Sequence, residues 1–149
     1  MTTSTLLMIR PAAFAFNPQT AVNNSFQKIN EQLDVHEKAL LEFDNFVHIL
    51  SVYGIKITVI QDTLEPHTPD SVFPNNWISF HEDGSVVLYP MFANNRKLER
   101  NKNVVEKLKE TFFIRSTIDL TTYEQQNAYL EGTGSMVLDR DHEIAYACL

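Results

Sequence analysis

The order of apolar patterns along the chain predicts a mixed α/β fold built from a repeated unit of hairpin, helix and strand. A short apolar run at residues 4–9 and an alternating run at residues 55–60 are typical of strands, and a long segment with helical spacing lies between them. A hairpin, a second helix, a strand and a last hairpin follow, which gives the order β, α, β, ββ, α, β, ββ. The two units share this order of elements but not their residues.

The helix between the first two strands has the clearest boundaries. A loop is expected before it over residues 11–24, because this stretch holds two prolines and three asparagines. Asp34 is the expected N-cap and forms a capping box with Glu37. Gly54 stands where a C′ glycine belongs. The side chains expected to face inward are Leu40, Phe43, Phe46, Val47 and Leu50.

The second half of the chain is expected to hold two hairpins separated by a helix and a strand. The expected elements are a hairpin of residues 77–80 and 86–89 around Glu82-Asp83-Gly84, a helix over about residues 95–111, a strand over residues 112–120, and a hairpin of residues 129–138 and 144–149. The helix should bury Val104, Val105, Leu108 and Phe112. The last apolar run has the pattern of a buried strand, so we expect a truncated chain or a module completed from elsewhere.

Composition and charge exclude several classes of protein. The chain has 149 residues and 17.1 kDa, enough for one domain, and 12 basic against 19 acidic residues give a net charge of −7. This balance argues against a nucleic-acid or anionic-membrane partner. A single cysteine rules out an internal disulfide and a cysteine-based metal site. No signal peptide or membrane-spanning run is found, so we expect a cytoplasmic protein without metal or cofactor.

The first segment that could carry chemistry runs from Asp70 to Trp77. A carboxylate, the amides of Asn75 and Asn76 and the ring of Phe73 lie between two predicted strands. Because an asparagine amide both donates and accepts hydrogen bonds, this group could grip a planar, nitrogen-rich ligand. The alternative is a turn made by proline and asparagine, with Trp77 in the core.

The second segment is Leu130-Glu-Gly-Thr-Gly-Ser135, which carries Glu131 just before two glycines. A glutamate at this place could hold a cationic group, and the glycines would let a backbone or ligand approach closely. The pattern is not a dinucleotide or phosphate-binding fingerprint. A solvated turn with a surface glutamate is the alternative.

Basic residues and histidines give weaker signals. Arg96, at the start of the second predicted helix, could bind a carboxylate, whereas Arg100 is expected on an exposed helical face. The acid-and-histidine groups at residues 81–83 and 139–142 fit hairpin turns better than metal sites. Cys148 is expected to be a small buried hydrophobe.

In this order and spacing, the segments resemble the amidinotransferase and guanidine-hydrolase superfamily, the penteins, whose fold is a propeller of five ββαβ modules. The nearest branch resembles bacterial amidinotransferase-like proteins proposed to act on citrulline. The matching segments are residues 6–11, 69–77, 88–96 and 130–135, which together cover essentially the whole chain. The resemblance implies one incomplete pentein domain over residues 1–149, about half of the fold, with modules at approximately 1–65 and 66–125 and the start of a third at 126–149.

The resemblance also implies roles for individual residues. In the family, a cysteine thiolate attacks the central carbon of a guanidino or ureido group, a histidine transfers protons, and carboxylates hold the planar head. The matching positions are Glu131 for the catalytic glutamate that holds the head group and orients the histidine, Asp70 and Phe73 for the lining of the head-group pocket, Asn75 and Asn76 in place of a Glu-Asp pair, and Arg96 for a carboxylate-binding arginine.

Two departures from the family pattern affect the expected function. The family histidine and cysteine come later than Leu149, so we expect the N-terminal part of a hydrolase or amidinotransferase that is inactive by itself. The asparagine pair removes negative charge from the pocket, which favours a neutral ureido substrate such as citrulline over arginine. The alternative is a non-catalytic pentein module that binds a small molecule or oligomerises. Exposed propeller edges would then favour self-association.

Overall fold

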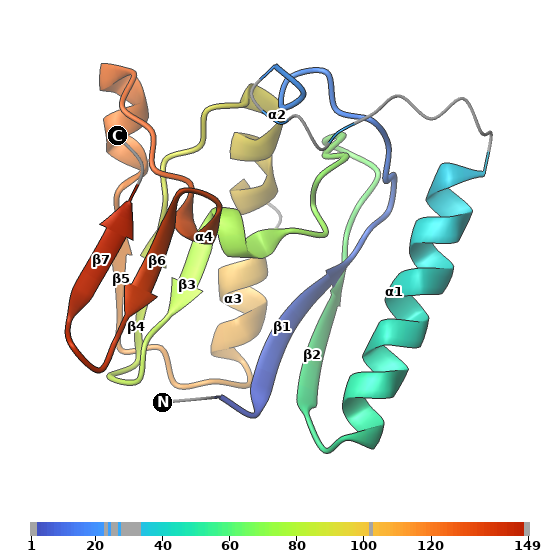
Figure 1. The fold of residues 1–149 in the computed structure, drawn as a ribbon, viewed down its shortest axis with the longest axis horizontal. Helices are drawn as coiled ribbons and strands as arrows, with labels where there is room; N and C mark the ends of the chain where they lie inside the picture. Colours follow the sequence, from blue (N-terminus) through green and yellow to red (C-terminus); the bar gives the residue numbers. More distant parts are fainter. Residues whose placement is uncertain (1–2, 23, 25–26, 28–33, 102, 148–149) are drawn as a thin grey trace. The chain divides into compact units, whose positions relative to one another are not determined.

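The computed structural model describes residues 3–22, 24, 27, 34–101 and 103–147 (Figure 1). They divide into two compact units, residues 2–73 and residues 74–149, which we call the N-terminal and C-terminal units. The mixed α/β class predicted from the sequence is confirmed. Each unit has its own small sheet or sheets and its own buried residues.

The N-terminal unit contains a parallel β-α-β arrangement. Strand β1 (Thr5–Arg10) pairs in parallel with β2 (Lys56–Gln61), and helix α1 (Val35–Val52) connects them. Figure 1 shows α1 lying alongside the two strands. A parallel pair needs such a crossover, because two strands that run in the same direction cannot be joined by a tight turn. Ile9 and Ile60 are buried within this unit.

The two ends of α1 follow different rules. Asp34 is the N-cap, but its side chain makes no capping hydrogen bond; it forms an ion pair with Lys38 at 3.1 Å instead, so the predicted capping box is wrong. At the other end Gly54 has φ +82°, and the Ile55 N–H donates to the Leu50 carbonyl at 3.1 Å. This is a Schellman ending, and it confirms the predicted C′ glycine.

Helix α1 buries fewer of its apolar side chains than its pattern predicts. Phe43 is buried, whereas Leu40, Val47 and Leu50 are half-buried. Phe46 is 52% exposed, so its predicted place in the core is wrong. A sheet of only two strands offers a narrow surface, and it cannot cover the wide apolar face of an 18-residue helix.

The C-terminal unit holds a three-stranded sheet and a separate hairpin. Strand β3 (Ile78–Phe80) pairs antiparallel with β4 (Ser85–Leu88), and β4 pairs in parallel with β5 (Ser116–Asp119). Strands β6 (Met136–Asp139) and β7 (Ile144–Ala147) form the second hairpin. Both predicted hairpins are therefore present. The strand predicted over residues 129–138 is wrong in its first part, because residues 132–135 form a helical turn and the strand begins only at Met136. The buried hydrophobic side chains of this unit are Trp77, Ile78, Val86, Val87, Tyr89, Met91, Ala93, Val104, Leu108 and Met136.

The second helix is broken, which the sequence pattern does not predict. The predicted helix of residues 95–111 is divided into α2 (Asn94–Lys97), the 3-10 turn η2 (Leu98–Asn101) and α3 (Val104–Lys109). Asn103 adopts a left-handed conformation with φ 57°, and asparagine tolerates this conformation better than most residues. A residue in that conformation ends the regular helical path, so α3 starts a new helix.

The last hairpin is more exposed than its composition predicts. Every residue of β7 is exposed, and Val137 and Tyr146 are 67% and 59% exposed. The expectation of a buried last strand is therefore wrong within this structure. Self-association through such edges stays a prediction. Among the described residues, no helix has the length and apolar character that crossing a bilayer requires.

Candidate functional site

The asparagine pair and the glutamate-glycine segment lie in contact within the C-terminal unit. Asn75 and Asn76 belong to the 3-10 turn η1 (Pro74–Asn76), which leads into β3. Gly132–Ser135 form the single-turn helix α4, which leads into β6. The Asn75 side-chain amide donates to Thr133 Oγ1 at 2.7 Å. Two segments that are 58 residues apart in the sequence are thereby joined directly.

Two glycines make this contact possible. A Cβ atom on Gly132 would collide with the backbone oxygen of Asn75 and would lie 2.9 Å from that of Asn76. A Cβ atom on Gly134 would collide with the side-chain nitrogen of Asn76. The prediction that these glycines permit a close approach is therefore confirmed, and the segment that approaches them is the turn of Asn75 and Asn76. The approach leaves the Asn76 amide against the α4 backbone.

Glu131 is half-buried at the N-cap of α4, and its carboxylate is oriented by the backbone. Its Oε1 accepts a hydrogen bond of 2.9 Å from the Phe92 N–H. Its Oε2 accepts none from the described residues. The Glu131 carbonyl accepts from the N–H groups of Gly134 and Ser135, at 2.8 and 3.1 Å. The Phe92 N–H therefore orients the carboxylate through one oxygen, and no described residue donates to the other.

Asp70 and Phe73 belong to the N-terminal unit. Asp70 is 4% exposed, and its Oδ2 accepts from the Asn17 amide at 2.7 Å and from Thr20 Oγ1 at 2.9 Å. The carboxylate therefore fastens the loop that follows β1, a role that the sequence does not indicate. Phe73 is 47% exposed. An exposed phenyl ring can stack on a planar cation.

The two arginines of the second predicted helix both pair with glutamates. Arg96 is 5% exposed, and its guanidinium binds both oxygens of Glu99, at 2.9 and 3.2 Å. Arg100 binds both oxygens of Glu124, at 2.6 and 3.0 Å, and its side chain is only 15% exposed. The expectation of a solvent-facing Arg100 is therefore wrong, because its guanidinium lies against the Glu124 carboxylate.

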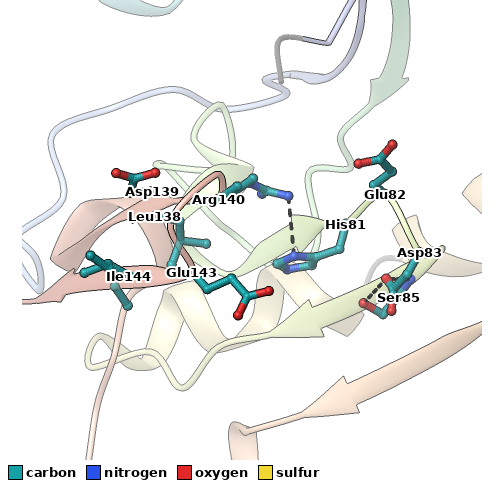
Figure 2. A pocket seen from close by; sticks show the side chains of 10 residues that line it. His81, Glu82, Asp83, Ser85, Leu138, Asp139, Arg140, Glu143 and Ile144 are labelled. Atoms are coloured by element: carbon teal, nitrogen blue, oxygen red, sulfur yellow. Dashed lines mark hydrogen bonds between the residues drawn. The ribbon is translucent and has the colours of Figure 1, made fainter.

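A cavity of about 420 Å³ lies between the two hairpin turns of the C-terminal unit, at the ends of β3 and β6 away from Glu131 and the asparagine pair (Figure 2). Arg140 donates to the Phe80 carbonyl at 3.1 Å and lies 3.4 Å from His81 Nδ1. Burial, followed by the nearby Arg140 charge, lowers the pKa of His81 below its ordinary 6.5. Among the described residues, no three histidine, cysteine, aspartate or glutamate side chains converge on a possible metal position.

The structure thus brings the segment of Glu131 together with Asn75 and Asn76, and hydrogen bonds orient the side chains of Glu131 and Asn75. It places Asp70 and Arg96 in buried polar networks instead. Sequence reasoning missed two contributors, the Phe92 N–H that orients Glu131 and the Glu124 side chain. A backbone N–H has no signature in a sequence, and Glu124 lies in no recognisable motif. Cys148 is outside the described residues.

Comparison with solved structures shows which fold the chain has. The structure matches ArgZ, an arginine dihydrolase from the ornithine-ammonia cycle in cyanobacteria, with a TM-score of 0.66 and 19% identity to its N-terminal domain, covering 96% of this chain and 48% of that one. It matches AgrE in complex with ornithine and NAD+ with a TM-score of 0.68 and 20% identity, covering 97% and 20%. A dimethylarginine dimethylaminohydrolase in its adduct with S-methyl-L-thiocitrulline gives 0.61 and 15%, covering 92% and 47%.

These likenesses establish the fold, and they concern a part of each relative. The chain spans about half of the N-terminal domain of ArgZ and a fifth of AgrE. The neighbours are penteins, so the predicted partial pentein architecture is confirmed, whereas its division into three modules stays a prediction. No curated protein sequence gives a significant match. Residues 10–149 match the family described as N,N dimethylarginine dimethylhydrolase, eukaryotic, and the chain therefore belongs to this family within the pentein amidinotransferase and hydrolase superfamily.

Proposed function

We propose that the protein is a hydrolase that acts on the carbon–nitrogen bond of a guanidino or ureido amino acid. The observation that carries this proposal is the Glu131 carboxylate, oriented by the Phe92 N–H through Oε1, while no described residue donates a hydrogen bond to Oε2. This glutamate stands beside an asparagine turn in a chain that belongs to a dimethylarginine hydrolase family. Neighbours named as an arginine dihydrolase and a dimethylarginine hydrolase support the same substrate class.

The site chemistry fits a planar head group. A guanidinium or ureido group presents N–H donors in one plane, and a carboxylate oxygen with a fixed direction accepts one of them. Preorganised acceptors help most where charge develops in the transition state, because they need no reorganisation. We assign the holding of the head group to Glu131 and its lining to the asparagine pair. Because Arg96 is buried against Glu99, we do not assign it the substrate carboxylate. Asp70 fastens the loop of Asn17 within the N-terminal unit.

The nucleophile and base of the reaction are assigned to a cysteine and a histidine beyond this chain. The thiolate adds to the central carbon, an amine leaves with a proton from the histidine, and water then releases the product and regenerates the thiolate. This sequence of steps needs no metal or cofactor. The 149 residues alone are therefore expected to contribute binding groups without turnover.

An assay of the protein at its natural length tests the proposal. The protein is incubated with dimethylarginine, arginine and citrulline, and the release of dimethylamine or ammonia is measured together with binding by calorimetry. Turnover of any of these compounds that is lost in Glu131→Gln supports the hydrolase. Binding without turnover supports the alternative of a non-catalytic binding module. Absence of both binding and turnover contradicts the assignment of the site.

A further inference from the structure

One short segment of the C-terminal unit is held at four consecutive residues. This segment, Tyr89–Phe92, follows β4 and carries the N–H that orients Glu131. Its four contacts are Tyr89 O with Arg100 at 3.3 Å, Pro90 O with the Leu130 N–H at 3.1 Å, the Met91 N–H with Glu124 Oε1 at 2.8 Å, and the Phe92 N–H with Glu131 Oε1 at 2.9 Å. Two of the four contacts come from one ion pair.

That ion pair is Arg100 with Glu124, and both of its members reach the segment. Arg100 comes from η2, and Glu124 comes from the 3-10 turn η3 (Thr121–Gln126). The pair is bidentate, and the side chains are 15% and 14% exposed. Charge-assisted bonds in a partly desolvated place are stronger than neutral ones, so they hold their backbone partners firmly. The ion pair therefore fixes the Tyr89 carbonyl and the Met91 N–H at the same time.

We propose that the Arg100–Glu124 ion pair is a positioning device for Glu131. The Met91 and Phe92 N–H groups belong to adjacent residues, and each donates to a glutamate, so the direction of one constrains the direction of the other. Removal of the Glu124 carboxylate leaves the Met91 N–H without its acceptor and leaves the Arg100 charge half-buried and unpaired. The Tyr89–Phe92 segment must then shift so that water can reach the Met91 N–H and the Arg100 guanidinium, and the Phe92 N–H turns away from Glu131.

The consequence for the reaction rests on the proposed function. Glu131 is the residue assigned to the head group, whereas Glu124 acts only through the Tyr89–Phe92 segment, so Glu124 is a positioning residue. A displacement of a catalytic group by about 1 Å can cost about 100-fold in rate. A glutamine at position 124 keeps an acceptor for the Met91 N–H and loses the charge, so it should retain much of the positioning. An alanine removes both.

The test compares Glu124→Ala, Glu124→Gln and the control Glu106→Ala in the full chain. Glu106 also pairs with a basic residue of the C-terminal unit, Lys109 at 2.9 Å, but this pair is exposed and touches no backbone group of the segment. Amide resonances of Phe92 and Leu130 are recorded by NMR, together with the urea midpoint. Glu124→Ala should move both resonances and speed hydrogen exchange at Phe92, Glu124→Gln should restore them in large part, and Glu106→Ala should leave them unchanged.

The same variants in the protein at its natural length separate positioning from the proposed function. With dimethylarginine as probe, Glu124→Ala should lower kcat by about 10- to 100-fold, with recovery in Glu124→Gln. A Phe92 amide that stays in place in a folded Glu124→Ala protein overturns the positioning role, whatever the activity. If the resonances move in Glu124→Ala but the wild-type protein does not turn over the probe, the positioning role is upheld. Only the proposed function is then rejected. If Glu124→Ala does not fold, Arg100→Gln is measured in its place, because it removes the partner that orients the Glu124 carboxylate. A Phe92 amide that stays in place in that protein overturns the positioning role.

Discussion

Alanine at Gly132 should separate the two segments that form the candidate site. Gly132 has φ +38°, and the left-handed region costs a residue with a Cβ atom about 1–2 kcal/mol. The new Cβ would also meet the backbone oxygens of Asn75 and Asn76, which cannot rotate away. Overpacking of this kind costs about 1–3 kcal/mol. The sum, about 2–5 kcal/mol, is a large part of the 5–15 kcal/mol that typically holds a domain together.

Two other glycines supply matched controls for this prediction. Gly54 has φ +82°, and a Cβ there meets nothing within 4 Å, so Gly54→Ala measures the backbone cost alone. At Gly134 the new Cβ would collide only with the end of the Asn76 side chain, since the Glu131 Cβ lies at an ordinary contact distance of 3.8 Å. Because that amide can rotate, Gly134→Ala should cost less than Gly132→Ala while displacing the Asn76 side chain.

The assay is urea unfolding followed by NMR signals from each unit, with the Asn76 side-chain amide resonance as the readout of site geometry. We expect the C-terminal unit of Gly132→Ala to lose clearly more stability than the N-terminal unit of Gly54→Ala loses. The Asn76 amide signal should move in Gly134→Ala. A Gly132→Ala protein that is no less stable than Gly54→Ala would refute the close approach of η1 and α4.

Three further predictions concern pH and substrate. The hydrogen bond from Arg10 lowers the pKa of Asp44 below its ordinary 3.8. This pair therefore stabilises the N-terminal unit above pH 3.8, and the stabilisation is lost as pH falls through the folded-state pKa. Arg10→Gln should abolish this pH dependence in urea midpoints measured across the acid range. Because the pKa of His81 is lowered, the neutral imidazole beside Arg140 stabilises the C-terminal unit above pH 6.5, and this stability is lost as pH falls through the folded-state pKa. His81→Gln should flatten the dependence of the urea midpoint on pH. An unaltered pH dependence would count against this role of His81. At natural length the protein should turn over citrulline at least as well as arginine, because asparagine amides suit a neutral ureido oxygen, and a strong arginine preference in parallel kinetics would end this idea.

The sequence predicts elements well where a local signal sets them. The Schellman ending at Gly54 and the two hairpins follow from residues close together in the chain. The break of the second helix depends on the left-handed conformation of Asn103, which most asparagines do not adopt and which the sequence therefore does not reveal. The exposure of Phe46 depends on how many strands lie beside α1, which the helix pattern does not report.

The candidate site shows the same division. The glycines and asparagines of the two motifs could be chosen from the sequence, because their chemistry is local. Their contact could not be predicted, because it joins residues 58 positions apart. The Phe92 N–H could not be predicted either, because every residue other than proline carries such a backbone group. The burial of Arg100 against Glu124 joins residues 24 positions apart, and no local sequence pattern reports such a contact.

The most direct test of the account is dimethylarginine and citrulline turnover by the protein at its natural length, compared between wild type and Glu131→Gln. If the fixed Glu131 carboxylate holds the planar head group, the substitution should lower kcat/KM by at least about 100-fold while the fold and the Phe92 amide environment persist. Unchanged turnover in a correctly folded Glu131→Gln protein would contradict the account, because the head group would then be held elsewhere.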